Sequence, residues 1–305
     1  MDRPLKLGTR GSPLALAQAH EAAAAIAAVH GWKPDAIEIV AIITSGDRNQ
    51  DRPLAEIGGK ALWTKELDRA LGEGKVDFCV HSMKDVESDR PAAFRLAAIL
   101  PRADVRDRLI GAESTDALGP SAVVGTSSPR RAAQLLRLRP DLKVVPLRGN
   151  VQTRIDKVSA GEIDATLLAA AGLERLGLAV GTPIPASVML PAPGQAAIGI
   201  ECRSDDGELV ALLAAASHGP SLACVTAERA FTRALGATCA SPVAALAEIA
   251  ASEMRLRCAI YSADGLECVA DDARITPGDD RIAEELARSM LARAPRSVRS
   301  LFEDM

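Results

Sequence analysis

Apolar and polar positions along this chain follow a pattern that occurs twice. At 6–18 (KLGTRGSPLALAQ) and 123–134 (VVGTSSPRRAAQ), a short apolar run leads into a Gly-Thr turn, a Ser-Pro pair and a segment with helical spacing. Apolar runs bounded by turn residues predict strands, and Ser-Pro before a helical pattern predicts an N-cap followed by the first helical residue. We therefore predict two copies of a strand, a turn and a helix.

A second pattern is repeated between 67–80 (LDRALGEGKVDFCV) and 155–168 (IDKVSAGEIDATLL). Each copy has an amphipathic helix, a glycine turn, an acidic residue and an apolar run. Strands are predicted at 37–44, 76–80, 123–125, 144–146 and 165–168, and they alternate with helical stretches. This alternation indicates an α/β fold of two similar lobes with largely parallel sheets, in which ligands bind at the carboxyl ends of the strands.

Breaks in the pattern mark the joints between domains. Proline and charge interrupt it at 100–108, and proline and glycine dominate 191–195. A third unit begins near 218, with a helix at 222–235, a loop at 236–242, strands near 256–261 and 267–270, and a final helix at 280–293. The pattern thus predicts joints near 100 and 195 and a small α+β unit from about 218 to the end.

Composition narrows the class of protein. The 305 residues are 48% apolar, enough for two or three domains, and the net charge of −4 with 2% aromatic residues argues against nucleic-acid binding. The N-terminus lacks a secretory apolar core, and no apolar run reaches the roughly 20 residues that span a membrane. Six cysteines without a CxxC pair predict free thiols and no metal site. We expect a cytoplasmic protein without a membrane or nucleic-acid partner.

The predicted helix starts are candidate anion sites. Ser12 and Ser128 fit N-caps, and the unpaired N–H groups of a helix start attract phosphate or carboxylate. Guanidinium groups that bind carboxylates lie nearby in sequence: Arg10, Arg130, Arg131, Arg148, Arg154 and Arg175. The alternative is a pair of well-capped helices without a ligand, with arginines spread over the surface.

Three further stretches carry candidate chemistry. In VHSMKDV (80–86), Asp85 follows a strand of buried character and could stabilise a cation. The alternative is a surface ion pair between Asp85 and Lys84. We interpret His81 as a structural residue. The paired glycines before Lys60 and Trp63 suggest a mobile flap or a plain loop. Cys239 lies among small residues in GATCASP. These leave space around its sulfur, so the thiol could be reactive, or Cys239 could be an inert buried residue.

Together these stretches resemble the porphobilinogen deaminase (hydroxymethylbilane synthase) family. The resemblance runs from about Leu5 to Pro242 and is carried by TRGSPLAL, GGKALWTKEL, VHSMKDV, VGTSSPRRAAQL, LRGNVQTR, AGLERLGL, PAPGQAAIGIECR and the Cys239 loop. It implies a transferase of tetrapyrrole and heme biosynthesis that condenses four porphobilinogen molecules head to tail, with release of ammonia. It also implies a dipyrromethane cofactor joined by a thioether to Cys239, and two lobes like those of periplasmic binding proteins. In this family's arrangement the chain crosses between the lobes near residues 100 and 195, so we expect residues 1–99 with 195–217 as a discontinuous first domain, 100–194 as a second, and 218–305 as a small α+β third that carries the cofactor. We expect a monomer.

The resemblance assigns roles residue by residue. Asp85 would stabilise the cation left when porphobilinogen loses ammonia, and the flap would carry Lys60 and Trp63. The cofactor-binding set would be Cys239, Lys84, Thr126, Ser127, Ser128, Arg130, Arg131, Arg148 and Arg154. The substrate-binding set would be Arg10, Ser12 and Arg175.

Three positions depart from the family's pattern. Ala61, Ala196 and Thr238 stand where glycine is common, which puts loop geometry in question because these residues tolerate positive φ badly. Two other classes compete with the resemblance. A carboxylate-binding module without catalysis would need neither Cys239 nor Asp85, and a cysteine hydrolase would need an activating histidine, for which the sequence offers no motif.

Overall fold

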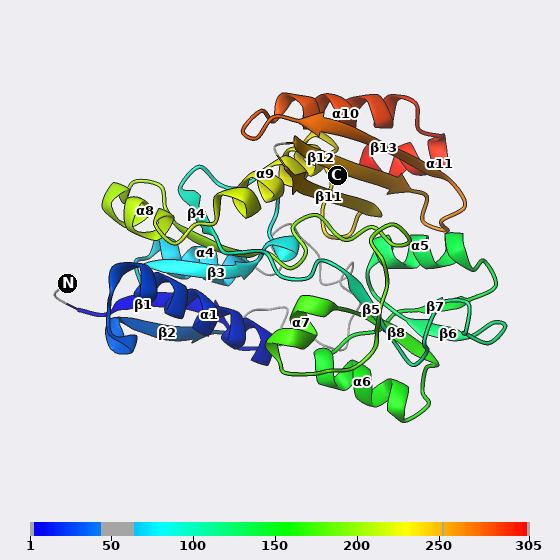
Figure 1. Cartoon of the computed structure of the whole chain (residues 1–305), viewed down its shortest axis with the longest axis horizontal. Coiled ribbons are helices and arrows are strands. Elements are labelled where there is room, and N and C mark those ends of the chain that lie inside the picture. Colours follow the sequence, from blue (N-terminus) through cyan, green and yellow to red (C-terminus); the bar gives the residue numbers. More distant parts are fainter. Residues whose placement is uncertain (1–2, 44–63, 252, 304–305) are drawn as a thin grey trace. The chain divides into compact units, whose positions relative to one another are not determined.

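The computed structural model describes residues 3–43, 64–251 and 253–303. The chain divides into two compact units, one made of Met1–Ala103 with Ala196–Leu222, the other of Asp104–Gln195 with Ala223–Met305. The first unit holds one five-stranded sheet, and the second holds a five-stranded and a three-stranded sheet (Figure 1). The predicted α/β class is confirmed.

The first unit is built on the sheet β2-β1-β3-β10-β4. Its elements are β1 (Leu5–Arg10), α1 (Pro13–His30), the 3-10 turn η1 (Pro34–Ala36), β2 (Ile37–Ile42), α4 (Lys65–Gly72), β3 (Phe78–Ser82), η2 (Met83–Asp85), β4 (Phe94–Ile99), β10 (Ile198–Arg203) and α8 (Gly207–Ala214). Leu7, Ile26, Phe78, Ile198 and Leu213 have no exposed surface and belong to the apolar core between sheet and helices.

The second unit repeats this plan in the sheet β7-β6-β8-β5-β9. Its elements are β5 (Asp107–Ile110), β6 (Val123–Gly125), α5 (Pro129–Leu138), β7 (Lys143–Val145), α6 (Val151–Ser159), β8 (Ala165–Ala169), α7 (Ala170–Arg175) and β9 (Thr182–Pro183). β1 and β6 are each the second strand of their sheet, and β3 and β8 are each the central strand. The repeats in the sequence therefore correspond to equivalent elements of two similar sheets.

The expectation of largely parallel sheets holds for only part of each sheet. β1 runs parallel to β2 and β3, and β6 runs parallel to β7 and β8. β10 is antiparallel to both its neighbours β3 and β4, and β5 is antiparallel to β8 and β9. The antiparallel direction of β5 and β10 has a topological reason. Each of these strands follows a passage of the chain from one unit to the other, so neither enters its sheet through the helical crossover that makes neighbouring strands parallel.

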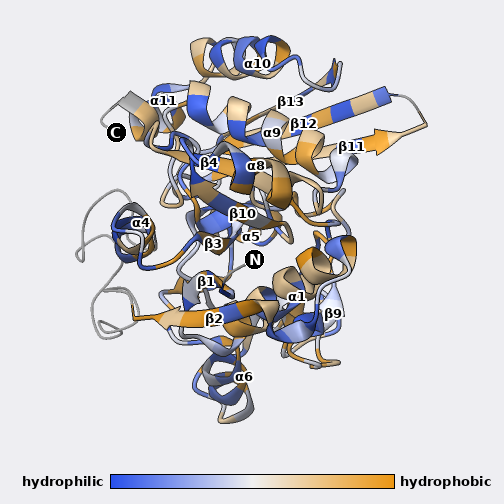
Figure 2. Ribbon diagram, turned by 90° about the vertical axis from the view of Figure 1, so that its left-hand side faces the viewer, coloured by the Kyte–Doolittle hydropathy of each residue, from blue (hydrophilic) through white to orange (hydrophobic). Residues whose placement is uncertain are grey.

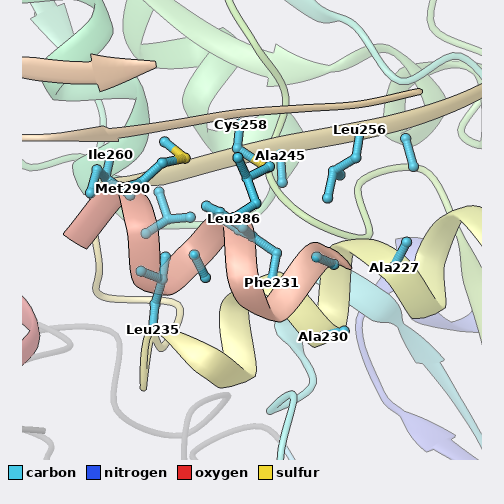
Figure 3. Packing of buried hydrophobic residues seen from close by; sticks show 14 of the residues in the cluster. Ala227, Ala230, Phe231, Leu235, Ala245, Leu256, Cys258, Ile260, Leu286 and Met290 are labelled. Carbon is cyan, nitrogen blue, oxygen red and sulfur yellow. The ribbon is translucent and has the colours of Figure 1, made fainter. Parts of the chain in front are cut away.

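The C-terminal part consists of α9 (Gly219–Ala234), β11 (Val243–Ala250), β12 (Glu253–Tyr261), β13 (Cys268–Ile275), α10 (Arg281–Ala292) and α11 (Arg296–Glu303). Helix α10 carries hydrophilic and hydrophobic residues along its length (Figure 2). Its Leu286 and Met290 pack with Phe231 of α9 and Leu256 of β12 in one apolar cluster (Figure 3). The spacing of Ala283, Leu286, Ala287 and Met290 gives the helix its buried face.

Within the second unit, the C-terminal part is joined to the region of the second sheet by buried contacts. Glu228 of α9 has no exposed surface, and its carboxylate accepts hydrogen bonds of 2.7 Å from the N–H groups of both Gly194 and Ala247. Gly265 has φ +74°, and a Cβ there would lie 2.1 Å from the carbonyl oxygen of Ala133 in α5, so the contact requires glycine. The division into three domains stays a prediction.

Candidate functional site

The first unit places a polar pocket at the carboxyl ends of β1 and β3. Because these strands are parallel neighbours, Arg10 and Ser82 end at the same edge of the sheet. A pocket of about 60 Å³ there is lined by Arg10, Ser12, Leu14, Ala15, Gln18, Thr64, Val80, His81, Ser82, Asp85 and Val86. Three residues selected from the sequence, Arg10, Ser12 and Asp85, thus line one pocket.

The start of α1 forms one wall of this pocket. Ser12 is the N-cap, its hydroxyl accepts the N–H of Ala15 at 3.3 Å, and Pro13 is the first helical residue, so the predicted cap is confirmed. The pocket therefore combines a positive helix end, the hydroxyl of Ser12 and the guanidinium of Arg10. This set of groups suits a carboxylate.

Asp85 lies in a short turn that is fixed by backbone contacts. The turn η2 directly follows β3, the N–H of Met83 donates to the carbonyl of Ala197 at 3.0 Å, and the N–H of Val86 donates to that of Met83 at 3.3 Å. Met83 is buried, whereas Lys84 and Asp85 are half-buried. The turn thus anchors its apolar residue and leaves the carboxylate of Asp85 at the pocket.

Behind the pocket lies a buried ion-pair network. His81 is 7% exposed, and its Nε2 is 3.4 Å from Oε2 of Glu201 on β10, in keeping with the structural role inferred for this histidine. Arg90 donates to both oxygens of Glu201 at 2.9 and 2.7 Å. Burial raises the pKa of Glu201, but the neighbouring His81 and the hydrogen bonds from Arg90 outweigh burial and lower that pKa to about 2.

Two polar residues of the pocket were not singled out from the sequence. Gln18 is 5% exposed, and its Nε2 donates to Oγ of Ser82 at 2.7 Å, which joins α1 to the end of β3. The available signal was a glutamine in an otherwise apolar helical segment, six residues after the predicted cap. Such a polar residue on a buried helix face needs a partner.

The second unit presents an equivalent helix start. Ser128 is the N-cap of α5, its hydroxyl accepts the N–H of Arg131 at 3.4 Å, and Pro129 is the first helical residue, as predicted. Ser127 donates to the carbonyl of Leu147 at 2.9 Å, and the hydroxyl of Thr126 accepts the N–H of Ser128 at 3.2 Å. These hydroxyl groups shape the loop at the end of β6.

Arg130 and Arg131 converge on one buried carboxylate that was not singled out from the sequence. Nη2 of Arg130 lies 2.9 Å from Asp107, and Nη2 of Arg131 lies 2.7 Å from it. Their Nη1 groups donate to the carbonyls of Leu190 and Leu167, both at 2.8 Å. Burial raises the pKa of Asp107, but the two arginines overcome it and hold that pKa well below its usual range.

This cluster has one more cation than anion. Burial lowers the pKa of Arg130, and the neighbouring charge of Arg131 lowers it further. The Nε–H groups of both arginines are buried and have no hydrogen-bond partner in the described part of the chain. Because buried charges are normally paired, an uncompensated positive charge is the unusual feature of this cluster.

The remaining predicted arginines follow strand ends of the same sheet. Arg148 is half-buried in the loop after β7, and Arg175 is the last residue of α7, which follows β8. Arg154 lies in α6, where its Nε donates to the carbonyl of Gly149 at 3.0 Å. The fold thus brings cationic side chains to the region where β6, β7 and β8 end.

Cys239 is the accessible thiol of the chain. It is exposed, whereas Cys79, Cys202, Cys224 and Cys258 are buried and Cys268 is half-buried. Burial raises the pKa of Cys79, Cys258 and Cys268, and raises that of Cys202 to about 11. Among the six cysteines, the thiol of Cys239 is therefore the one that a reactant can reach most easily.

The residues that replace common glycines behave differently from one another. Thr238 does not have a positive φ, and its hydroxyl accepts the N–H of Ala240 at 3.2 Å, while Gly236 with φ +67° makes the left-handed turn. Ala196 does adopt φ +71°, as the sequence led us to suspect. The predicted flap residues Lys60 and Trp63, and Ala61, lie outside the described residues.

Comparison with known proteins gives a consistent result. Residues 5–211 match the family model "Porphobilinogen deaminase, dipyromethane cofactor binding domain", and residues 222–293 match "Porphobilinogen deaminase, C-terminal domain". A porphobilinogen deaminase from Sphingopyxis alaskensis is 55% identical over 99% of this chain and 97% of its own length. One from Paracoccus denitrificans is 48% identical over 96% and 95%.

One solved structure aligns with most of the chain at low similarity. A periplasmic substrate-binding protein of an ABC transporter from Coxiella burnetii aligns with 72% of this chain and 93% of its own, at 17% identity and a TM-score of 0.42.

Among the described residues, no single helix is long and apolar enough to cross a membrane; α8 and α9 meet the criterion only as a pair bent by 114°.

Proposed function

We propose, because the chain belongs to the porphobilinogen deaminase family, that it is the transferase that condenses four porphobilinogen molecules head to tail into hydroxymethylbilane and releases ammonia. This reaction belongs to tetrapyrrole biosynthesis. The family model over residues 5–211 is that of a dipyrromethane-binding domain, so the primer of the reaction is a covalently bound dipyrromethane.

The residues present fit such a cofactor. When bound, a dipyrromethane supplies a pyrrole ring with a free nucleophilic carbon, and its acetate and propionate groups make it a polyanion. The cluster of Arg130 and Arg131 offers an excess positive charge, and the Nε–H donors of both arginines have no hydrogen-bond partner among the described residues. Those donors, the start of α5, Lys84, Arg148 and Arg154 would hold its carboxylates, and Cys239 would carry the thioether.

The pocket of the first unit supports a catalytic role for Asp85. A carboxylate next to the N–H groups of a pyrrole stabilises positive charge that develops on the ring when ammonia leaves. Arg10 and Ser12 line the same pocket, and we assign to them and to Arg175 the binding of the substrate's carboxylates. Asp85 therefore stabilises the positive charge that develops on the substrate, and the arginines hold the substrate in position.

The observation that carries the proposal is the exposure of Cys239, the accessible thiol among the six cysteines. The test is an intact mass of the freshly purified, denatured protein. We expect the mass of the chain plus one dipyrromethane, with the addition on the peptide that contains Cys239. Cys268→Ser, at the next most accessible cysteine, should keep the addition, and Cys239→Ser should lose it together with activity. An active protein with Cys239 unmodified contradicts the proposal.

We also propose that the enzyme is a cytoplasmic monomer without a nucleic-acid or membrane partner. The net charge of −4 and the six free cysteines support this, because free thiols suit a reducing compartment. Sedimentation of the holo-protein at several concentrations tests the monomer. A mass that rises with concentration to that of a dimer contradicts it.

A further inference from the structure

Arg90 is the centre of a cluster that joins three parts of the first unit. Its guanidinium binds both oxygens of Glu201 on β10, and it contacts the two oxygens of Asp68 on α4 at 2.6 and 3.1 Å. It also donates to Glu87 at 3.1 Å. The Arg90 side chain is only 10% exposed, so one cation is surrounded by three carboxylates in a largely buried place.

The cluster touches the walls of the pocket that contains Asp85. Thr64 lines that pocket, donates to Glu87 at 3.1 Å and accepts from Arg90 at 3.3 Å. His81 lines the same pocket and lies 3.4 Å from Glu201. Arg90 thus contacts Thr64 directly and His81 through Glu201, and both of these residues line the same pocket as Asp85.

The turn that carries Asp85 is held on both sides. On its N-terminal side, the N–H of Met83 donates to the carbonyl of Ala197, which immediately precedes β10. On its C-terminal side, Glu87 is held by Arg90, which in turn is tied to Glu201 of β10. Asp85 lies midway between these two anchors, and both lead to the same strand. A change at either anchor shifts the carboxylate while the sheet remains in place.

The electrostatics make the second anchor depend on Arg90. Burial opposes the charge on Arg90, but the bonds to Glu201 and Asp68 outweigh burial and raise its pKa. Without this guanidinium, Glu201, Asp68 and Glu87 would lose the cation that they share. Glu87 and the adjoining turn would then move away from the other two charges.

We propose that Arg90 is a positioning residue, which holds the carboxylate of Asp85 in its working place by tying Glu87 to Glu201 and Asp68. The inference rests on the proposed function, because it concerns the same reaction. A misplacement of about 1 Å in a reacting group can cost roughly a hundredfold in rate, so this kind of support is visible in turnover.

The test uses holo-protein in which cofactor content has been matched by intact mass. Arg90→Lys keeps the charge but cannot bind Glu201 and Asp68 with a planar fork, and Arg90→Met removes the charge. Arg95→Met, an exposed arginine on the adjoining strand β4, is the matched control. Single-turnover condensation of porphobilinogen is measured in each. We expect a loss of about tenfold for Arg90→Lys and more for Arg90→Met, with Arg95→Met within about twofold of the parent.

A double-mutant cycle separates positioning from general support of the fold. In an Asp85→Glu background the carboxylate is already displaced by one methylene, so Arg90→Lys should cost less than about twofold there. An equal loss in both backgrounds, or full activity of Arg90→Lys, overturns the inference. If Arg90→Met does not fold, Arg90→Lys still decides the matter. A parent protein that fails to condense porphobilinogen would refute the proposed function instead.

Discussion

Asp107 and Arg130 form an ion pair inside the second unit, with Oδ2 of the carboxylate 2.9 Å from Nη2 of the guanidinium. The other oxygen binds Arg131 at 2.7 Å and the side-chain amide of Gln195 at 3.0 Å. One anion thus orders two cations at the start of α5, where positive side chains are otherwise unfavourable for the helix dipole. The arginines are fixed in place before any ligand arrives.

Loss of either arginine should impair cofactor assembly. Arg130→Ala or Arg131→Ala breaks a buried pair, which typically costs about 3–5 kcal/mol, and removes charge from the carboxylate site. We expect both variants to purify largely as apo-protein by intact mass. Arg139→Ala, whose partner Asp141 lies at the surface, is the control and should load normally.

Arg10 should behave differently from that pair, because it lines the pocket of the first unit. Arg10→Ala is expected to load cofactor nearly normally while substrate binding or chain growth slows, which the ratio of turnover to loading would measure. Equal loading and equal turnover in the Arg10, Arg130 and Arg131 variants would contradict the different roles proposed for Arg10 and for the two arginines of α5.

Asp85→Asn should separate binding from chemistry. It keeps the size of the side chain and removes its charge, so folding and cofactor loading should survive while condensation falls roughly a hundredfold to a thousandfold. Asp85→Glu should retain more activity, because the charge remains although it is displaced. Single-turnover rates in preparations of equal cofactor content give the answer. A rate for Asp85→Asn within about threefold of the parent would make Asp85 a structural residue.

Ala196→Gly should stabilise the protein. Ala196 has φ +71°, a left-handed conformation that costs a residue with a Cβ roughly 1–2 kcal/mol, and glycine relieves it at the expense of some unfolded-state entropy. We expect a net gain of up to about 1 kcal/mol in urea unfolding. Ala215→Gly, at φ −61°, is the control and should lose stability. A loss at Ala196 as large as that at Ala215 would show that its backbone is not strained.

Glu201 should contribute stability that acid removes. Its pKa falls from an ordinary 4.5 to about 2 in the folded protein, so its contribution is present above 4.5 and is lost as the pH falls toward 2. The free energy of unfolding of the parent should therefore exceed that of Glu201→Gln most clearly near neutral pH, with the gap narrowing between pH 4.5 and 2. Glu248→Gln, an exposed partner of Arg257, is the control. A gap that stays constant with pH would show that the carboxylate does not ionise differently on folding.

Local signals were sufficient for the helix starts. Ser12 with Pro13 and Ser128 with Pro129 are neighbours in sequence, and a cap involves only the first turn of its helix. The small residues around Cys239 left two readings open, and the exposure of its side chain fits the reactive one. Helix caps depend on a few adjacent residues, so they can be predicted without knowledge of the fold.

Contacts between distant residues could not be predicted in this way. Asp107 stands between two arginines in the sequence and resembles a surface charge, although its partners lie 23 and 24 residues further on. Glu201 and Arg90 are 111 residues apart, and β10 was not predicted as a strand at all. The antiparallel course of β10 and β5 was missed for the same reason, because strand direction depends on how the chain returns.

Strand β10 has a consequence for how the protein is made. It lies between β3 and β4, yet its residues 198–203 follow the whole of the second five-stranded sheet in the chain. During translation, β1, β2 and β3 leave the ribosome together with β4 but without the strand that joins them. The first sheet then has extra open edges that can pair with other chains until synthesis has passed Arg203. The first sheet therefore completes its pairing only after the second five-stranded sheet has been synthesised, and a nascent chain that stops before Ile198 is the form most exposed to aggregation.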